Sequence, residues 1–575
     1  MINKLRELMK INNIDTYIIT KFDPHQSEDS EEYYSSVKFI SGFTGSAGTV
    51  VVTQGYAGLW TDGRYYIQAK KELNKNIELV KASNPGVIGF LDYAYKNTKT
   101  NGKIAFDGET MSCYMVKNLL EKTEKKNITL ETNVDFIGEL WTNRPSLSKN
   151  NIFIHEEKYC GESSQSKIKR VREKMDTDYY IISSLDDIAW LTNLRGSDVE
   201  NNTFFAAYFV LSKNDAILFI DKDKLDFHVD HVDVEVRDYN EIYDYLKALE
   251  SENIALKSSS TNYNIFKACQ GKKIIELPID ITEEFKAIKN SIEIENLEKV
   301  NIRDGVAMVR SIKWVKENYR EMDEVDVANK FAEYRQIGTN YVGPSFGTIA
   351  AYMSNAAMSH YHPTKENCSK LKDGGFMLVD SGGQYFDGTT DMTRTFSLGN
   401  LSDEMKKDFT YVLKSHIAIA SAKFPENATG GQIDGITRAS MWEDGVDFNH
   451  GTGHGLGFFG CVHEGPHNIS GKSTRNFPKG ILVTNEPGLY KEDKYGIRTE
   501  NTVTVEDFKS TEFGNFYKFR TISYCPIDID AIDVSMLNSR EIKWVNDYHD
   551  VVFSKLKDYL DSEEVEFLEV ETRRI

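Results

Sequence analysis

Apolar residues in the first half of the chain are grouped in two similar stretches. Residues 15–20 (DTYIIT) and residues 178–183 (DYYIIS) are short runs of β-branched and aromatic residues, and each follows an amphipathic, basic segment. After a Gly-containing turn, a second apolar run follows in each stretch, at residues 49–52 (TVVV) and 204–211 (FFAAYFVL). Short apolar runs bounded by turns predict strands, and amphipathic segments predict helices. The pattern therefore predicts two related α/β domains, and its long period indicates a domain duplication and not a solenoid.

A third domain is predicted from a long amphipathic segment further along the chain. Asn290 stands where a helix cap is expected, with Glu293 three residues on, which is the pattern of a capping box. Residues 537–560 predict a further amphipathic helix. A polar linker covers residues 141–151. The apolar residues that fall largely on one face of the long segment are Leu297, Val300, Val306, Val309 and Ile312. We therefore expect three domains, at residues 1–142, 143–285 and 286–575.

Composition and charge exclude several classes of function. The 575 residues exceed what one core usually organises, in keeping with several domains. A net charge of −19 argues against a nucleic-acid partner or an anionic membrane surface, because phosphate binding needs clustered positive charge. No apolar run is long enough to span a bilayer, and residues 1–20 lack the apolar core of a signal peptide. Six scattered cysteines without a C-x-x-C pair predict reduced thiols and a cytoplasmic location.

Two aspartates in residues 376–396 are the first candidates for a metal site. Asp380 ends an apolar run, and Asp391 precedes an alternating run eleven positions later. Gly382 and Gly383 allow a bend between them, so two neighbouring strands could aim both carboxylates at one point. Aspartates beside glycine are also common turn residues, and this segment alone leaves both interpretations open.

Two glutamates and a histidine complete the candidate set. Glu486 also ends an apolar run, and Glu500 is expected inside a later strand, ENTVTV, where a glutamate is costly to bury unless it is paired or coordinated. His454 lies in a glycine-rich segment, where a lone histidine is more often structural. Four carboxylates and one imidazole suit Mn, Co, Fe or Zn. Because four carboxylates carry more charge than one divalent ion needs, the set predicts two ions bridged by carboxylates.

Two other motifs in this region predict no site of their own. Residues 463–467 (HEGPH) match the H-E-x-x-H zinc pattern, which requires both histidines on one face of a helix. Pro466 would break such a helix, so we exclude His467 from the site. Residues 451–457 (GTGHGLG) lack the spacing of a nucleotide-binding loop, and no Walker A sequence or G-x-S-x-G elbow is present.

The chain resembles the pita-bread peptidases, and within them the aminopeptidase P family. The catalytic motifs that carry the resemblance are VDSGGQYFDGTTDMTRT, HGTGHGLG, VHEGP, NEPGLY and GIRTENTVTV. Residues 23–48, 59–69 and 186–200 resemble the long, three-domain, cytosolic type, so the resemblance covers nearly the whole chain. It implies an α/β (α+β) fold, with two creatinase/prolidase-like α/β domains followed by a C-terminal pita-bread catalytic domain. It also implies a homodimer.

The resemblance assigns metal-binding roles to the five candidates. Asp380 would bind one ion, His454 and Glu486 would bind the other, and Asp391 and Glu500 would bridge both. The ions would be two divalent metals, with Mn favoured and Co or Zn as alternatives.

The resemblance also assigns substrate-side roles. His360 (in MSHYHP), His450 and His463 match the family's substrate-side histidines, and Arg64 (in TDGRYY) matches a substrate-contacting arginine. Arg498 matches an arginine behind the bridging acids. The loop before His360 departs from the family, because IAAYMSNAAMSHYHP stands where a more glycine-rich loop is expected, and His362 matches no family position.

The implied activity is hydrolysis of the N-terminal Xaa-Pro bond of peptides. We hypothesise that a metal-bridging hydroxide attacks the carbonyl carbon, that His360 or His463 helps to stabilise the oxyanion, and that Glu486 moves the proton to the proline nitrogen. A prolidase, which cleaves Xaa-Pro dipeptides, is the first alternative, and the length and the duplicated N-terminal half disfavour it. A non-catalytic pita-bread binding module is the second, and the five filled ligand positions disfavour it.

Overall fold

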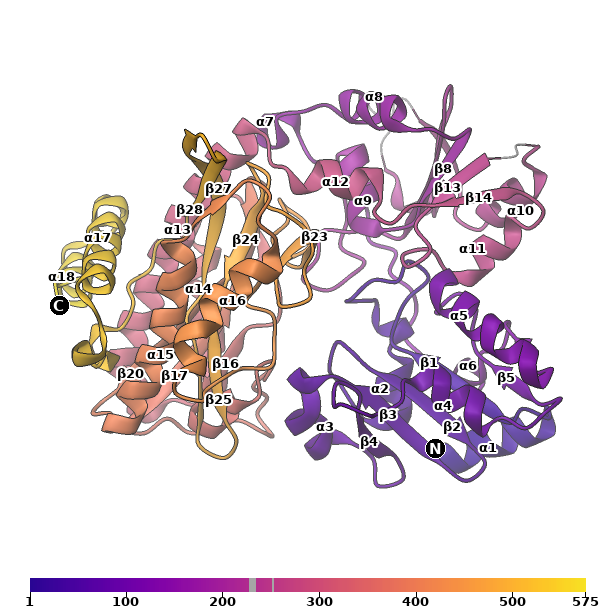
Figure 1. Ribbon diagram of the computed structural model, residues 1–575, viewed down its shortest axis with the longest axis horizontal. Coiled ribbons are helices and arrows are strands. Elements are labelled where there is room, and N and C mark those ends of the chain that lie inside the picture. Colours follow the sequence, from indigo (N-terminus) through magenta and orange to yellow (C-terminus); the bar gives the residue numbers. More distant parts are fainter. Residues whose placement is uncertain (227–233, 251–252) are drawn as a thin grey trace. The chain divides into compact units, whose positions relative to one another are not determined.

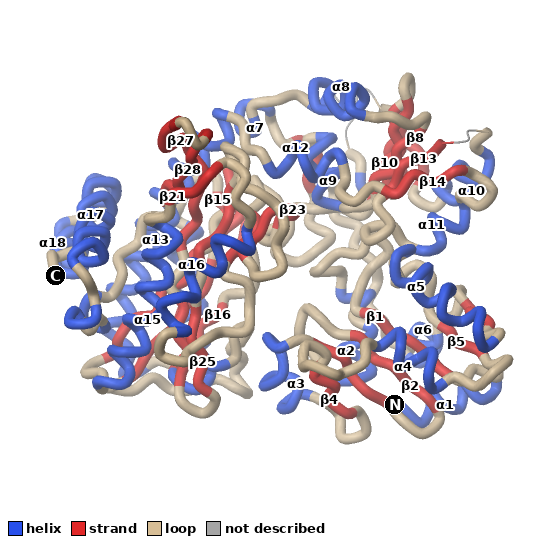
Figure 2. The backbone as a smooth tube through the Cα atoms, viewed as in Figure 1, coloured by secondary structure: helices blue, strands red, loops and turns tan. Residues whose placement is uncertain are grey.

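The computed structural model describes residues 1–226, 234–250 and 253–575, and the chain forms two compact units (Figure 1). Unit 1 comprises Met1–His155 and Glu162–Thr282, and unit 2 comprises Glu156–Gly161 and Glu283–Ile575. Both units contain helices and strands (Figure 2), so the mixed α/β class expected from the sequence is confirmed. No helix among the described residues is both long and apolar enough to cross a membrane.

Unit 1 begins with a six-stranded mixed sheet in the order β4-β3-β2-β1-β5-β6. β1 is antiparallel to β2 and parallel to β5, and all five of its residues are buried. The strands are β1 (Thr16–Thr20), β2 (Thr49–Thr53), β3 (Ala57–Thr61), β4 (Glu78–Lys81), β5 (Lys103–Ala105) and β6 (Thr129–Glu131). The helices of this part are α1 (Ile2–Ile11), α2 (Ser36–Ser41), α3 (Tyr66–Glu72), α4 (Phe90–Asn97), α5 (Cys113–Thr123) and α6 (Phe136–Leu140).

The second sheet of unit 1 repeats this topology in the order β12-β11-β10-β8-β13-β14. β8 is antiparallel to β10 and parallel to β13, just as β1 is to β2 and β5. The predicted duplication is therefore confirmed strand by strand. The strands are β8 (Tyr179–Ile182), β10 (Ala207–Ser212), β11 (Ala216–Ile220), β12 (Glu235–Asp238), β13 (Asn253–Leu256) and β14 (Lys273–Glu276). The helices are α8 (Ser164–Lys174), α9 (Leu185–Thr192), α10 (Glu241–Ala248) and α11 (Tyr263–Ala268).

Unit 2 is organised around the long helix α13 (Ser291–Asn318). The Asn290 side chain accepts hydrogen bonds from the first turn, and the Glu293 carboxylate accepts one from the Asn290 backbone N–H, so the predicted capping box is present. The five apolar positions expected on one face are all buried. The other long helices are α14 (Glu324–Gln336), α15 (Asp403–Ala420) and α16 (Gly430–Trp442).

All strand pairs of unit 2 within the described residues are antiparallel. The six-stranded sheet has the order β21-β28-β27-β24-β22-β23, and a three-stranded sheet has the order β16-β17-β20. The strands of these sheets are β16 (Ile349–Tyr352), β17 (Gly375–Ser381), β20 (Met392–Leu398), β21 (Lys423–Pro425), β22 (Gly453–Gly455), β23 (Glu464–Ile469), β24 (Leu482–Asn485), β27 (Asn501–Thr511) and β28 (Gly514–Thr521). A second three-stranded sheet has the order β15-β18-β19, and β25 pairs with β26. These strands are β15 (Tyr341–Pro344), β18 (Gly383–Tyr385), β19 (Gly388–Thr389), β25 (Gly488–Lys491) and β26 (Tyr495–Arg498).

The C-terminal segment differs from the single helix expected at residues 537–560. Helix α17 (Ser539–Leu556) ends earlier, and a second helix, α18 (Ser562–Glu571), follows it. Asp561 caps α18 in a capping box with Glu564. Because the sequence of α18 is highly charged, its pattern did not indicate a face that packs against the rest of the unit. An ion pair of 2.7 Å between Lys316 of α13 and Glu571 holds this face in place.

We expect the substitution Asn290→Ala to destabilise unit 2 by about 1 kcal/mol, because it removes the acceptor for the first turn of α13. The measurement is urea unfolding, monitored through the hydrogen exchange of the backbone amides of α13. Asn318→Ala at the exposed C-terminal end of the same helix is the control and should change stability by less than about 0.5 kcal/mol. Equal effects of the two substitutions would contradict a role for the cap.

Candidate metal centre

Two antiparallel strands bring Asp380 and Asp391 to the same place. Asp380 is the last residue but one of β17 and lies opposite Thr393 of β20, and Asp391 immediately precedes β20. Because the strands are antiparallel, the end of one meets the start of the other. Asp380 is 8% exposed and Asp391 is 4% exposed, so these are not solvent-facing turn residues.

The strands β24 and β27 do the same for the two glutamates. Asn485 at the end of β24 pairs with Asn501 at the start of β27. Glu486 directly follows Asn485 and Glu500 directly precedes Asn501, so the two glutamates lie at the same end of this strand pair. The expectation that Glu500 lies within a strand is corrected by one position, since β27 begins at Asn501. Glu500 is only 1% exposed, in agreement with the expected burial.

The glycine-rich segment places His454 beside these acids. His454 is the middle residue of β22, which pairs with both β23 and β24. A Cβ atom at Gly453 would lie 1.9 Å from the Thr484 carbonyl oxygen, and one at Gly455 would lie 2.1 Å from the Glu464 carbonyl oxygen. The glycines are therefore required by the close approach of neighbouring strands.

Five side chains gather around one point. Ligand atoms of Asp391, His454 and Glu500 all lie within 4.8 Å of one another. His454 Nε2 lies 3.3 Å from Asp391 Oδ2 and 3.6 Å from Glu486 Oε1. Because His454 Nδ1 donates to the carbonyl of Gly455 at 3.0 Å, Nε2 is left to face the acids. Burial alone would lower the pKa of His454, but the facing carboxylates raise it above its ordinary value.

Two orphaned oxygen atoms show that the site fits a cation. Asp380 Oδ2 accepts a hydrogen bond from Arg498 at 2.6 Å, and Glu500 Oε2 accepts one from Thr393 at 2.7 Å. Asp380 Oδ1 and Glu500 Oε1 are buried and accept no hydrogen bond from the described residues. Buried carboxylate oxygens without a partner are costly, and a divalent cation is a ligand that satisfies them. The oxygen-rich donor set suits Mn, Co or Zn.

The electrostatics lead to the same conclusion. Burial raises the pKa of Glu500 well above its usual range, and the neighbouring charges of Asp391, Asp380 and Glu486 raise it further. Burial also raises the pKa of Asp380, although Arg498 opposes this rise, and it raises the pKa of Glu486. Like charges this close cannot all be ionised without protons or cations to balance them.

A chain of hydrogen bonds connects His450 to the acids. Arg498, which binds Asp380, also donates from Nη1 to the Tyr490 hydroxyl at 2.6 Å, and this hydroxyl lies 2.9 Å from His450 Nε2. Since His450 Nδ1 donates to the carbonyl of Gly451 at 2.7 Å, the neutral ring accepts from Tyr490 at Nε2. Our sequence reasoning did not single out Tyr490. It stands in the quoted motif NEPGLY, but nothing in the pattern marked its hydroxyl.

The other predicted histidines divide into neighbours of the site and one excluded residue. The rings of His463 and His454 lie with centroids 4.4 Å apart. His360 follows Ser359, whose carbonyl accepts a hydrogen bond of 3.4 Å from Arg498 Nη2. His362 is exposed. His467 lies in strand β23 and donates to the Asn476 carbonyl at 2.9 Å, so the H-E-x-x-H match is not helical.

Arg64 belongs to unit 1, whereas the metal centre belongs to unit 2. Its guanidinium binds Asp62 through two hydrogen bonds, Nε to Oδ1 at 3.0 Å and Nη2 to Oδ2 at 2.8 Å. The pair lies at the start of the short helical turn Gly63–Tyr65, which follows β3. The carboxylate fixes the direction in which the arginine projects.

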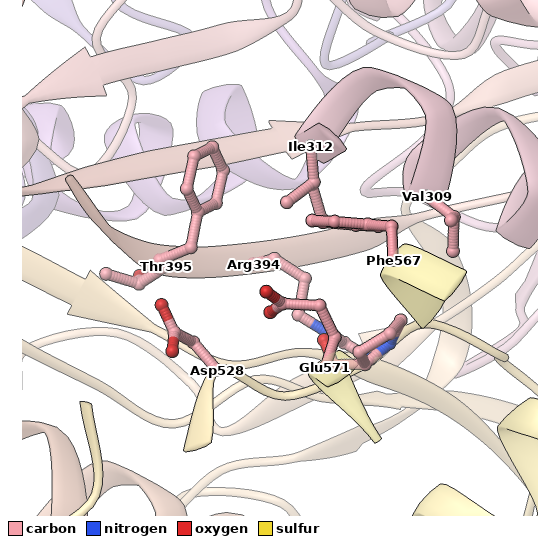
Figure 3. Close-up of a pocket in the computed structure, with 9 residues that line it drawn as sticks. Val309, Ile312, Arg394, Thr395, Asp528, Phe567 and Glu571 are labelled. Carbon is pink, nitrogen blue, oxygen red and sulfur yellow. The ribbon is translucent and has the colours of Figure 1, made fainter. Parts of the chain in front are cut away.

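A small cavity of about 10 Å³ marks a second feature that sequence reasoning passed over (Figure 3). Arg394, Asp528 and Glu571 contribute to its lining. The buried Arg394 guanidinium donates to the Glu500 carbonyl at 2.6 Å and to the Tyr548 hydroxyl at 2.9 Å. Arg394 therefore ties the backbone of a candidate ligand to helix α17. An arginine in an alternating strand pattern is usually solvent-facing, so the sequence did not indicate that Arg394 is buried behind the site.

We expect metal removal to make the stability of the protein more pH-dependent. The folded-state pKa values of Glu500, Asp380 and Glu486 are raised, so the folded apoprotein binds more protons than the unfolded chain. Their stabilising effect is present below the unfolded values of about 4 and is lost as the pH rises through the folded values. The melting temperature of chelated protein should thus fall from pH 5 to pH 8 more steeply than that of metal-loaded protein. Glu500→Gln should reduce this difference, and identical slopes with and without metal would refute it.

Four successive segments of the chain match models of known protein families. Residues 1–135 and 143–293 match the creatinase/prolidase N-terminal domain, residues 295–507 match metallopeptidase family M24, and residues 515–575 match the C-terminal region of that family.

Similar proteins match over nearly the whole chain. A probable Xaa-Pro aminopeptidase P from Coprinopsis cinerea is 38% identical and covers 99% of this chain and 97% of its own. Aminopeptidase P2 from Arabidopsis thaliana is 36% identical and covers 95% of this chain and 84% of its own. The crystal structure of an X-prolyl aminopeptidase from Caenorhabditis elegans, described as a cytosolic enzyme with a di-nuclear active site, has a TM-score of 0.95 at 31% identity and covers 100% of this chain and 99% of its own. The chain therefore belongs to metallopeptidase family M24, in which it is a metallo-exopeptidase of the aminopeptidase P type.

Proposed function

We propose that the protein is an Xaa-Pro aminopeptidase, which removes the first residue from peptides that have proline in the second position. The observation that carries this proposal is the cluster of Asp380, Asp391, His454, Glu486 and Glu500, with its orphaned carboxylate oxygens. The full-length similarity to proteins named Xaa-Pro aminopeptidase P supports the bond specificity.

We propose a dinuclear site with Asp380 on one ion, His454 and Glu486 on the other, and Asp391 and Glu500 shared. The described resemblance to a structure with a di-nuclear active site supports two ions. Manganese is our first candidate, with cobalt and zinc as alternatives, because carboxylates outnumber the single imidazole. When bound, two divalent ions supply a water molecule of lowered pKa and polarise the scissile carbonyl.

The residues of the chain supply proton transfer and oxyanion binding. Glu486 is our candidate for carrying the proton from the attacking water to the proline nitrogen, because its raised pKa and its place beside His454 suit a group that accepts and releases a proton. His360 and His463 are candidates for hydrogen bonding to the oxyanion. His450 would act on the substrate side, and its ring is held by Tyr490.

The substrate imposes its own requirements. A peptide bond before proline has no N–H group to anchor, and the ring restricts the backbone to a narrow range of conformations. Recognition must therefore rest on the free N-terminus, the carbonyl and the ring. We propose that Arg64 contributes to substrate binding from the N-terminal domain.

We also propose the domain division 1–142, 143–285 and 286–575, a homodimer and a cytosolic location. A location in the cytosol is supported by the description of the nematode enzyme as cytosolic. The expected partners are peptides with proline in the second position, and the net charge of −19 disfavours nucleic acid and an anionic membrane surface.

We expect metal-stripped protein to be inactive and to recover hydrolysis of an Xaa-Pro-Yaa tripeptide when Mn, Co or Zn is added back. The tripeptide should be preferred over the Xaa-Pro dipeptide by at least about tenfold in kcat/KM, whereas a prolidase would show the reverse. Asp391→Asn and Glu500→Gln should each lower kcat by about 100-fold or more and reduce the bound metal. Glu512→Gln, an exposed acid of the same unit, is the control. Normal activity and metal content in either ligand variant would overturn the proposed site.

We expect Arg64→Ala to lower kcat/KM for the tripeptide by about 10- to 100-fold while the metal content stays unchanged, because it removes a substrate contact and no ligand. Arg237→Ala is a matched control, since Arg237 also pairs with an acid two residues earlier, Glu235, in the same unit. Steady-state kinetics and metal analysis of both variants measure the effect. Unchanged kinetics for Arg64→Ala would remove this arginine from the substrate site.

A further inference from the structure

The loop between β16 and β17 carries His360 and has little regular structure of its own. It contains one short 3-10 helix, Met353–Ala357, and otherwise forms turns and irregular chain up to Gly375. A loop of this length needs contacts outside itself to hold one conformation. A side chain that must meet a substrate needs such support, because a displacement of about 1 Å can cost about 100-fold in rate.

A single buried carboxylate supplies much of this support. Glu324, the first residue of α14, is fully buried. Its carboxylate accepts hydrogen bonds from the backbone N–H groups of Tyr352 and Ser369, both at 2.6 Å. It also accepts from the Tyr361 hydroxyl at 2.8 Å and from the Asn355 side chain at 3.0 and 3.1 Å. Tyr352 is the last residue of β16 and the other three donors belong to the loop, so this one carboxylate holds the start, the middle and the end of the segment.

The hydrogen-bond donors to the Glu324 carboxylate are all neutral groups. Within the described parts of the chain, no lysine or arginine forms an ion pair with Glu324. Burial raises the pKa of Glu324, and the hydrogen bonds from Tyr352, Ser369, Tyr361 and Asn355 lower it in opposition. Removing acceptor capacity here would therefore leave several buried donors unsatisfied, which is costly.

His360 lies between two tethers. The residue before it, Ser359, is held through its carbonyl by Arg498, which also binds Asp380 of the metal centre. The residue after it, Tyr361, is held through its hydroxyl by Glu324. The three consecutive residues thus connect the metal centre on one side with α14 on the other. Both chain neighbours of His360 are therefore held.

We propose that Glu324 is a positioning residue for the peptidase reaction. It acts through Tyr361 to hold His360 towards the substrate. This inference rests on the proposed substrate-side role of His360. In the described part of the chain, Glu324 forms no hydrogen bond or ion pair with the five candidate metal ligands; it fixes the conformation of the loop that carries His360.

The test is a double-mutant cycle with kcat/KM for an Xaa-Pro-Yaa tripeptide as the readout. Glu324→Gln keeps the shape of the side chain and replaces one acceptor oxygen by a donor, so we expect kcat/KM to fall by about 10- to 100-fold with unchanged metal content. If Glu324 acts through His360, the same substitution in a His360→Ala background should cost less than about threefold. A loss in the double variant equal to the product of the two single losses would overturn the inference.

Two further variants keep the test interpretable. Tyr361→Phe removes the hydrogen bond between the Tyr361 hydroxyl and Glu324 and should lower kcat/KM by about 3- to 10-fold. This loss should also be suppressed in the His360→Ala background. Tyr361→Phe decides the question if Glu324→Gln does not fold. Glu571→Gln is the matched control, a buried glutamate of the same unit bound to Lys316, and its effect should be under about twofold and should multiply with that of His360→Ala. Full activity of His360→Ala itself would remove His360 from the proposed mechanism, and this inference with it, whereas a multiplicative double variant removes only the role of Glu324.

Discussion

The crowding of four carboxylates around one imidazole is the constraint on which unit 2 depends. Asp380, Asp391 and Glu500 are all less than a tenth exposed, and across the described residues Arg498 is the only arginine or lysine that forms an ion pair with any of the four acids. One arginine cannot neutralise this charge in a site that excludes most water. The folded protein therefore takes up protons or cations here, and metal binding and folding are thermodynamically linked.

The surrounding structure holds the acids together in spite of their repulsion. Two pairs of antiparallel strand ends fix the backbone positions of the ligands, so that no flexible loop has to bring them together. Behind them, Arg394 binds the carbonyl of Glu500, and Arg498 binds Asp380 and the Tyr490 hydroxyl. All three guanidinium nitrogens of each arginine donate hydrogen bonds, which makes each a rigid spacer as well as a positive charge. The supporting residues are thus as specific in geometry as the candidate ligands.

The sequence predicted those features of the fold and the site that depend on residues close together in the chain. The duplicated sheets, the cap at Asn290 and the strand ends at Asp380 and Glu486 follow from periodicity, capping and turn chemistry, which act over a few residues. Tyr490, Arg394 and Glu324 were not predicted, since their roles depend on contacts that the sequence does not display. Arg394 and Tyr548 are 154 positions apart. Helix α18 was missed for the same reason, because its half-buried partner Lys316 lies on α13.

Neutral donors suit a loop that borders an acidic site. A lysine or arginine used to hold the loop would be attracted to the carboxylates of the metal centre and would compete there with a divalent ion. Glu324 avoids this competition, because it accepts only from amides, a carboxamide and a hydroxyl. As an anion it would also be repelled from the centre, and its fixed place at the start of α14 keeps it with the loop donors. Arg498, which holds the carbonyl of Ser359 beside His360, has its own charge paired with Asp380, so this contact to the loop adds no unpaired charge to the site.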